Sequence, residues 1–337
     1  MAALYLHIGT PKTGTTALQN FRYKNRRKLA KNGIFMPEAG MLNGKKVKQN
    51  AYWLYNENVD DQTREEKFRE LGETAKVYPK ILLADERIWD LRANRIPFWE
   101  ELKNSLDRQD ILLKVVVYLR RQDTYIYSKW AQSIKYGRSG KYPSYTFQEF
   151  LKSDDYHPEL LDYAGVLKGI ASVIGKENLI VRVYDSNRFY GGTIFSDFFY
   201  AIGEPDISSY KMIDHLSNTS LSGNVLEAKR LLNQYGFPSE EYDIRQLLKN
   251  VQAKMQADGT LIEKTEFSAE DREAFLKNYE EGNRLIAGRY LGREDGILFY
   301  EDVRSKQYNV GEYTMEELVP VFSALLTEAL KEKKKKN

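Results

Sequence analysis

The stretch GTPKTGTT, residues 9 to 16, follows directly on an apolar run at residues 3 to 8. It nearly fits the phosphate-binding pattern G-x-x-x-x-G-K-[ST], in which a glycine-rich loop between a strand and a helix wraps around a phosphate. Thr15 stands where that pattern has its lysine, and the lysine lies three residues earlier, at Lys12. The stretch therefore predicts a buried strand, an anion-binding loop and a helix that begins where the loop ends.

Each residue type in this loop has a use in holding a phosphate. Gly9 and Gly14 allow tight backbone turns. The hydroxyls of Thr15 and Thr16 suit the first turn of a helix, where unpaired amides and the helix dipole attract an anion. Lys12 on the rising arm places its charge beside a bridging oxygen of a single terminal phosphate. A plain strand-to-helix turn with an exposed lysine is the alternative, but the combination of residues favours a phosphate site.

Four short apolar runs without alternation predict strands that are buried on both faces of a sheet. Stretches with helical periodicity lie between them. Strand and helix in turn imply parallel strands joined by right-handed crossovers, so we expect an α/β fold: a P-loop-like, doubly wound parallel sheet flanked by helices, with extra C-terminal helices. The predicted strands are 3–8, 80–84, 111–119 and 178–184, and the predicted helices are 16–31, 97–106, 123–136 and 159–174.

The length of 337 residues allows one elaborated domain or two modest ones, and we expect a single domain over 1–337. Its α/β nucleotide-binding core is expected over 1–216, with an insertion at about 41–69 that is rich in Asn, Gln and charge. From residue 217 onward the strand signal ends, which predicts a mainly helical flank or cap over 217–337. The helical stretches there are 222–236, 268–290 and 314–333.

The composition narrows the choice of partners and cofactors. The 51 basic and 48 acidic side chains nearly cancel, which argues against DNA or RNA as the main partner. The chain has no cysteine, and its three histidines show no metal-like spacing. Disulfides, a cysteine nucleophile and a zinc site are therefore not expected.

The two ends of the chain carry signals of their own. The N-terminus lacks the basic region and apolar core of a secretory signal, and no apolar stretch approaches about 18 residues, so we expect a cytoplasmic protein. The basic segment KEKKKKN, residues 331–337, is typical of a solvated helix end. A weak contact between these lysines and an anionic membrane surface is the alternative.

Two carboxylates follow the second predicted strand. In open α/β sheets, ligands bind at the carboxyl ends of the strands, so Asp85 and Glu86 are candidates for facing a ligand. A carboxylate there could take a proton from a hydroxyl if burial raises its pKa. The alternative is a surface carboxylate that pairs with Arg87 or caps the next turn.

Two arginines, Arg120 and Arg121, follow the third predicted strand. Asp123 can cap the helix that comes next, and Ser128 falls off the stripe of this helix that we expect to be buried. Arg120 and Ser128 could therefore converge on one anion, the arginine with a fork of donors and the serine with a hydroxyl. The buried stripe consists of Ile126, Trp130 and Ile134.

The two motifs together resemble the nucleotide-binding signatures of the PAPS-dependent sulfotransferases, PAPS being 3′-phosphoadenosine-5′-phosphosulfate. The shared features are PKTGTT after the first strand and the pattern Arg-x7-Ser after a later one. The longer stretches HIGTPKTGTTALQ, YLRRQD and NRLIAGRYLGREDG resemble the bacterial branch of this family, which sulfates glycans and other metabolites. The resemblance covers residues 4 to 130 and returns near residues 283 to 299.

The resemblance implies a donor site with a role for each matching residue. Lys12 would neutralise the phosphate as it leaves, and Arg120 and Ser128 would hold the 3′-phosphate. Glu86 matches the acidic residue that acts as base in glycan-modifying relatives, and Tyr184 matches a strand-end tyrosine near the adenine. The loop that would cradle the 5′-phosphosulfate consists of Pro11, Lys12, Thr13, Gly14, Thr15 and Thr16.

Three assignments stay open. The sequence has RRQD where many relatives have Arg-Asn-Pro, so the part of Arg121 is undecided. Glu86 is the first choice for the base, Asp85 the second, and His7 inside the first strand the third. For Tyr184, a tyrosine that only closes the edge of the sheet fits equally well.

The expected activity is the transfer of the sulfuryl group from PAPS to an acceptor hydroxyl by in-line displacement. Charge builds on the bridging oxygen during cleavage, and a lysine beside that oxygen stabilises it, so no metal is expected to be required. Aromatic clusters flanked by polar residues suit sugar rings and, with the resemblance, favour a glycan or glycan-like acceptor. The alternatives are a P-loop kinase or NTPase with a displaced lysine and a non-catalytic nucleotide-binding protein.

Overall fold

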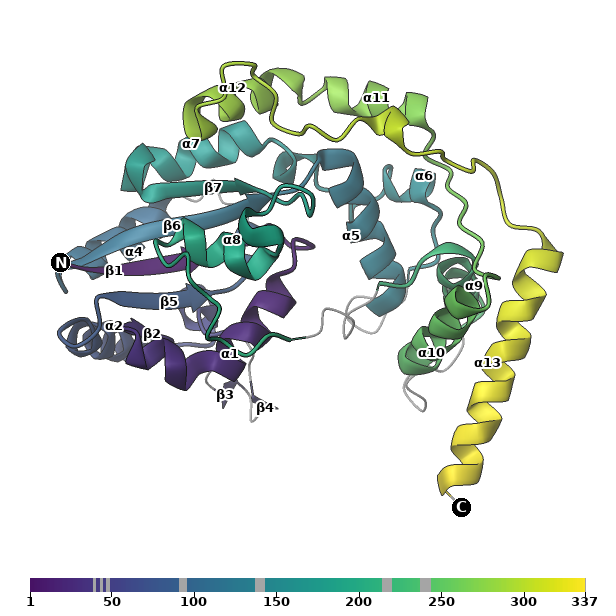
Figure 1. Cartoon of the computed structure of the whole chain (residues 1–337), viewed down its shortest axis with the longest axis horizontal. Helices are drawn as coiled ribbons and strands as arrows, with labels where there is room; N and C mark the ends of the chain where they lie inside the picture. The colour runs from purple at the N-terminus through teal and green to yellow at the C-terminus, as the bar shows by residue number, and fades with distance from the viewer. Residues whose placement is uncertain are drawn as a thin grey trace. The chain divides into compact units, whose positions relative to one another are not determined.

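The computed structural model describes residues 1–38, 41–42, 45–46, 49–90, 96–136, 143–213, 220–236 and 244–336. They form two compact units (Figure 1), each built from three separate segments of the chain. The first unit comprises Met1–Arg121, Pro158–His215 and Tyr279–Tyr300, and the second comprises Gln122–His157, Leu216–Asn278 and Glu301–Asn337. The predicted single domain, its division at residue 216 and the insertion at 41–69 stay predictions.

A five-stranded parallel sheet forms the centre of the first unit, in the order β2-β5-β1-β6-β7. From β1 the chain moves to the β5 side and then crosses to β6 and β7 on the other side, which is the doubly wound arrangement. The predicted α/β fold class is therefore confirmed. The strands are β1 (Ala2–His7), β2 (Ile34–Phe35), β5 (Lys80–Ala84), β6 (Ile111–Leu119) and β7 (Leu179–Val183), and a separate antiparallel pair joins β3 (Met41–Leu42) to β4 (Lys45–Lys46).

Helices cover both faces of this sheet (Figure 1). Successive residues of a strand point to opposite faces, so Leu4 and Leu6 of β1 lie in one core, with α2, α4, α7 and α12, while Tyr5 lies in another, with α1 and α8. In the first core, α12 packs on α7, and a Cβ at Gly282 would lie 3.3 Å from the Cβ of Ala164. The helices are α1 (Thr15–Lys31), α2 (Asp61–Ala75), α3 (Arg87–Asp90), α4 (Ile96–Asp107), α7 (Tyr163–Ile174), α8 (Ile194–Ala201) and α12 (Glu280–Leu291).

The second unit is helical in its described elements. Leu318, Val321 and Leu325 are buried on one side of α13, which packs against α9 and α10. The predicted stripe of α5 is confirmed, because Ile126, Trp130 and Ile134 are all buried. The helices are α5 (Gln122–Tyr136), α6 (Phe147–Phe150), α9 (Gly223–Gln234), α10 (Ile244–Ala257), α11 (Ala269–Lys277) and α13 (Met315–Lys336).

Several elements differ from the sequence prediction. The predicted helix over 268–290 ends at Lys277 and starts again at Glu280, and its two halves, α11 and α12, belong to different units. The helices α2, α8 and α10 and the two-residue strand β2 were not predicted. In α2, for example, only Phe68, Leu71 and Gly72 are buried among 15 residues, so its apolar stripe is too thin to stand out.

The predicted capping role of Asp123 is wrong. Helix α5 begins at Gln122, so Asp123 lies inside the first turn, where it is completely buried. Its carboxylate accepts a hydrogen bond of 3.1 Å from Nη1 of Arg272 in α11. The Arg272 guanidinium also lies 4.5 Å from the centre of the Phe267 ring and 4.6 Å from that of Tyr308. The pair thus joins two helices of the second unit through a buried ionic contact.

No helix in the described part of the chain combines the length and the apolar character needed to cross a bilayer.

We expect Arg272→Met to lower the free energy of unfolding by roughly 3–5 kcal/mol, because it leaves the buried Asp123 carboxylate without its counter-charge. The matched control, Glu73→Gln, removes an exposed ion pair with Lys76 and is expected to cost no more than about 1 kcal/mol. Urea unfolding at neutral pH measures both values. Equal effects of the two variants would contradict a structural role for the buried pair.

Candidate active site

The carboxyl ends of four strands bring the predicted site residues of the first unit to one edge of the sheet. In register, His7 of β1 lies between Ala84 of β5 and Val116 of β6, and Leu119 of β6 lies beside Val183 of β7. The loop after β1, the Asp85–Glu86 pair after β5, Arg120 after β6 and Tyr184 after β7 therefore begin close together. This is the edge at which open α/β sheets bind their ligands.

The loop after β1 is pinned to β6 before it turns. The Tyr118 amide donates to the Gly9 carbonyl (2.7 Å), and the Thr10 amide donates to the Tyr118 carbonyl (2.9 Å), which also accepts from the Thr10 hydroxyl (3.0 Å). Lys12 then takes a positive φ of 68°. Such a conformation is uncommon for a residue with a side chain, and it is frequent at sites where function dictates the backbone.

Helix α1 begins immediately after the loop. Gly14 has φ 73°, which glycine adopts without the strain of a Cβ, and no side chain of the described residues caps the helix there. The uncapped N-terminus keeps the partial positive charge that attracts an anion. A Cβ at Gly14 would lie 3.4 Å from the Tyr184 ring, so the loop and this tyrosine are in close contact.

Arg120 is connected to both the loop and Tyr184. Its Nη1 donates a hydrogen bond of 3.0 Å to the Lys12 carbonyl, and its guanidinium carbon lies 5.9 Å from the centre of the Tyr184 ring. The Arg120 carbonyl accepts a 2.8 Å bond from the hydroxyl of Tyr163 in α7. Four elements, the loop, β6, β7 and α7, thus fix the position of this arginine.

Glu86 lies against the loop on the β5 side. Its carboxylate accepts a hydrogen bond from the hydroxyl of Thr15, the first residue of α1. A Cβ at Gly9 would lie 3.4 Å from the Cβ of Glu86, which is an ordinary contact distance, so Glu86 lies next to the start of the loop as well. The side chain is only partly buried. The first choice for a base therefore lies beside the threonine that would bind a phosphate or sulfate oxygen.

Asp85 differs from its neighbour, because it is fully buried and bonded into the framework. Its carboxylate accepts a 2.7 Å bond from the Tyr55 hydroxyl and a 3.0 Å bond from the Arg87 amide. Burial raises the pKa of the Asp85 carboxyl, and the two hydrogen bonds act against that rise. Burial, together with the charge of the neighbouring Asp85 carboxylate, raises the pKa of the Tyr55 hydroxyl. With both carboxylate oxygens engaged, Asp85 fixes the turn after β5.

His7 is a core residue. It is 1% exposed, and its ring packs edge-on against the rings of Tyr118 and Phe198 at centre distances of 6.0 and 5.5 Å. Its Nε2 has no hydrogen-bond partner among the described residues. Burial, helped by the nearby Arg22 guanidinium, lowers the pKa of His7 to about 3. The imidazole is therefore neutral at physiological pH and enclosed by aromatic side chains.

Two predicted residues are not brought to this edge by the contacts of the first unit. Ser128 lies in α5, partly buried, and α5 belongs to the second unit, so its convergence with Arg120 stays a prediction. Arg121, the last residue of the first unit, is only 6% exposed, which distinguishes it from the less buried Arg120. Its role stays open.

Sequence reasoning missed the residues that support the site. Asn50 bonds to the backbone at the C-terminal end of strand β5: its side-chain nitrogen donates to the Leu82 carbonyl (3.0 Å), and its side-chain oxygen accepts from the Ala84 amide (2.8 Å). Asn50 thus substitutes for a neighbouring strand where β2 has already ended. Like Tyr55, it lies in the stretch that was expected to be an insertion, and no local pattern indicates its long-range partner.

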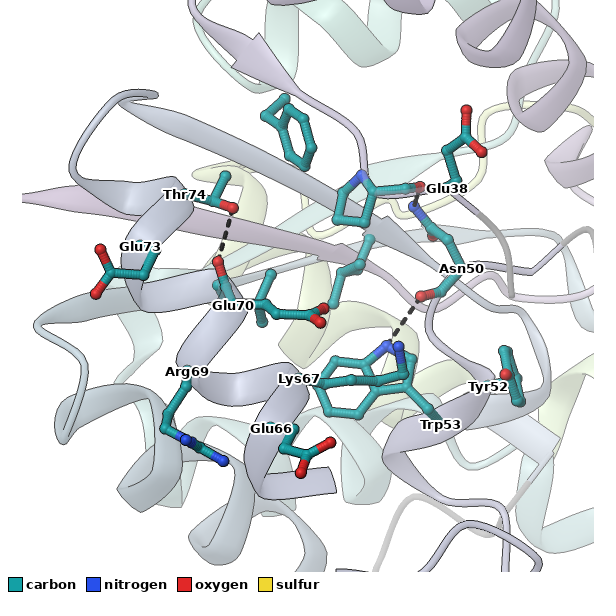
Figure 2. Close-up of a pocket in the computed structure, with 14 residues that line it drawn as sticks. Glu38, Asn50, Tyr52, Trp53, Glu66, Lys67, Arg69, Glu70, Glu73 and Thr74 are labelled. Atoms are coloured by element: carbon teal, nitrogen blue, oxygen red, sulfur yellow. Dashed lines mark hydrogen bonds between the residues drawn. The ribbon is translucent and has the colours of Figure 1, made fainter. Parts of the chain in front are cut away.

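A cavity of about 830 Å³ opens beside Asn50, between the β2–β5 edge and α2. Figure 2 shows Trp53, whose indole nitrogen donates to the Asn50 carbonyl (3.1 Å), and the charged side chains of α2 that line the cavity. Carboxylates outnumber cations in the lining itself, but Glu38 pairs with Arg26 and Glu73 pairs with Lys76, so the charges around the cavity are balanced. The carboxylates are Glu38, Glu66, Glu70 and Glu73, and the cations are Lys67 and Arg69.

The described residues contain no group of three His, Asp or Glu side chains arranged to hold a metal ion.

Comparison with known proteins gives limited similarity. No family model matches the chain. An uncharacterized protein of Archaeoglobus fulgidus is 24% identical over 227 residues, which is 66% of this chain and 56% of that protein, so the chain spans little more than half of its relative. The crystal structure of a sulfotransferase from Alicyclobacillus acidocaldarius aligns with 73% of this chain and 99% of its own, at 14% identity and a TM-score of 0.40.

We expect the stability of the protein to fall in acid partly because of His7. The pKa of a histidine is 6.5 in an unfolded chain, and that of His7 is about 3 in the folded protein, so between these values only the unfolded chain binds the proton. This group alone should cost about 3 kcal/mol of unfolding free energy between pH 7 and pH 4, a loss that His7→Gln should abolish. Urea unfolding across this range measures it. Parallel pH profiles for the two proteins would contradict the assignment.

Proposed function

We propose that the protein is a sulfotransferase that moves the sulfuryl group from 3′-phosphoadenosine-5′-phosphosulfate to an acceptor hydroxyl. The observation that carries the proposal is the set of contacts at one edge of the sheet. Arg120 bonds to the Lys12 carbonyl, Thr15 bonds to Glu86, and Gly14 packs against Tyr184. A cation, a carboxylate and an aromatic ring thus lie around the uncapped N-terminus of α1. The transfer needs a cation for the leaving phosphate and a base for the acceptor hydroxyl.

Lys12 is proposed to stabilise the leaving phosphate. In the transfer, the bond between sulfur and the bridging oxygen breaks while a bond between sulfur and the acceptor oxygen forms, and the phosphate keeps the electron pair. The positive φ of Lys12 and the anchoring of residues 9 and 10 to β6 support a fixed position for this lysine. A preplaced cation lowers the barrier because it needs no reorganisation as charge develops.

Glu86 is proposed to take the proton of the acceptor hydroxyl. Its contact with Thr15 supports this role, because the threonine hydroxyl is also suited to bind an oxygen of the phosphosulfate. When that hydroxyl turns to the donor, the Glu86 carboxylate loses one hydrogen bond and gains the capacity to accept a proton. Asp85 and His7 are weaker candidates, since the first is bonded to Tyr55 and Arg87 and the second lies in the core.

Arg120, with Ser128, is proposed to hold the 3′-phosphate, and Tyr184 to lie near the adenine. The cation–aromatic contact of Arg120 with Tyr184 supports a common subsite for the two. A guanidinium has five N–H donors, and the bond to the Lys12 carbonyl engages one of them. A kinase would place a lysine directly after Gly14, where this chain has Thr15.

The acceptor is proposed to be a glycan or glycan-like metabolite that enters from the side of the 830 Å³ cavity. The cavity lies beside the C-terminal end of β5, where Asn50 bonds to Ala84 and Tyr55 bonds to Asp85, the neighbour of Glu86. Its polar and charged side chains, beside the aromatic rings of Tyr52 and Trp53, suit a sugar with several hydroxyl groups. A cytoplasmic location is part of the proposal, and so is a weak membrane contact through the C-terminal lysines.

Donor binding is the first test. Adenosine 3′,5′-bisphosphate should raise the melting temperature of the protein, because it binds only the folded state, and the shift should be lost in Arg120→Ala. ATP with Mg²⁺ and ADP are the comparison ligands. A shift only with ATP and Mg²⁺ would instead support a kinase or NTPase. No shift with any of them would contradict a nucleotide site.

The second test concerns turnover. Lys12→Ala should lower kcat by two or more orders of magnitude, since losing one preplaced donor to a developing charge costs roughly 3 kcal/mol. Glu86→Gln should also lower kcat while it leaves the bisphosphate-induced thermal shift intact. The assay follows transfer of labelled sulfate to an acceptor library. A normal rate in either variant would remove that residue from the mechanism.

A further inference from the structure

Helix α13, Met315–Lys336, has more apolar surface than its own unit covers. Leu318, Val321 and Leu325 are buried where the helix packs on α9 and α10. A second apolar stripe runs beside this buried one. It consists of Met315, Val319, Phe322, Leu326 and Leu330, and four of these side chains are largely exposed: Met315 (67%), Val319 (53%), Leu326 (67%) and Leu330 (62%).

The spacing of the second stripe is that of a helix-pairing seam. From Met315 to Leu326 its members follow one another at intervals of four, three and four residues. Such alternation keeps apolar side chains on one line along a helix and allows them to interlock with those of a second helix. Single exposed apolar residues need no explanation, but a continuous exposed stripe marks an interaction surface.

The charges of α13 are separated along its length. The first turn has two carboxylates, Glu316 and Glu317, and no cation. At the other end, lysines outnumber carboxylates among the described side chains: Lys331, Lys333 and Lys334 against Glu328 and Glu332. A second α13 in antiparallel orientation would therefore bring the acidic end of each helix to the basic end of the other. A parallel arrangement would place lysines against lysines.

We propose that the exposed stripe of α13 pairs with the same stripe of a second copy of this chain, in antiparallel orientation. The two-fold symmetry of such a pair uses one surface twice, as is usual for homodimers. An anionic lipid surface explains the features less well, because it would attract the lysines but repel Glu316 at the other end of the stripe. The inference is independent of the proposed sulfotransferase activity.

The size of the contact sets the expected affinity. A helix of 22 residues is about 33 Å long, and one helix pair buries less area than a standard interface of roughly 1,600 Å². We therefore expect a reversible dimer with a Kd in the micromolar range, on the order of 1–100 µM. The dimer should be visible as a rise in mean mass with concentration.

The test measures this mass by sedimentation equilibrium over a range of concentrations. Leu326→Glu should raise the dissociation constant at least about tenfold, because it places a charge in the seam. Thr327→Glu is the matched control: it adds the same charge at the next, exposed residue of α13, off the stripe, and should leave the constant unchanged. Melting temperatures of both variants verify that they fold.

The orientation can be tested with single cysteines, because the chain has none of its own. If antiparallel helices are centred on Ser323, S323C should form a disulfide between copies on mild oxidation. M315C should not, since its two sulfurs would be separated by about 24 Å along the helix axis. Efficient crosslinking of both variants would indicate a parallel pair and overturn the antiparallel arrangement.

Two outcomes would overturn the proposal as a whole. One is a wild-type protein that stays monomeric at every accessible concentration. The other is a dissociation constant that Leu326→Glu leaves unchanged while it abolishes cosedimentation with vesicles of phosphatidylserine and phosphatidylcholine, which would assign the stripe to a lipid surface. Loss of sulfotransferase activity without a change in mass would concern the proposed function alone.

Discussion

The backbone hydrogen bonds that join residues 9 and 10 to Tyr118 are the constraint on which the candidate site depends. They extend the pairing of β1 with β6 beyond the end of the strand, so the direction in which the loop leaves the sheet is set by the sheet itself. The turn at Lys12 and Gly14 then starts α1 at a fixed point. Arg120, Glu86 and Tyr184 all contact this part of the chain, and without its anchoring their mutual positions would not be defined.

The sequence predicts the parts of the fold whose signal is local. Strands β1, β5, β6 and β7 and helices α1, α4, α5 and α7 could be predicted from unalternating apolar runs and helical periodicity. Strand β2 could not, because two residues carry no period, and α2 could not, because few of its residues are buried. The capping role given to Asp123 was wrong for a related reason: its partner, Arg272, lies 149 positions away, and no local pattern shows it.

In the candidate site, the sequence predicts which residues lie at the strand ends, but not how deeply each side chain is buried or what it contacts. Asp85 and Glu86 are adjacent carboxylates at the same strand end, yet one is buried and bonded to Tyr55 while the other is partly exposed beside Thr15. The difference between the two carboxylates arises from their long-range contacts, since both lie beyond the last residue of β5. His7 shows the same dependence, because only the surrounding Tyr118 and Phe198 rings reveal why its pKa is low.

Because its last segment is Tyr279–Tyr300, the first unit can finish folding only late in the synthesis of the chain. Ile286, Ala287 and Leu298 belong to the core on the α7 face of the sheet, although the last strand of that sheet ends at Val183. A ribosome must therefore add about a hundred residues, including the Leu216–Asn278 segment of the second unit, before this core can close. Until then the part of α7 that α12 covers stays exposed to solvent, although α4 and the sheet already cover the rest of its apolar side.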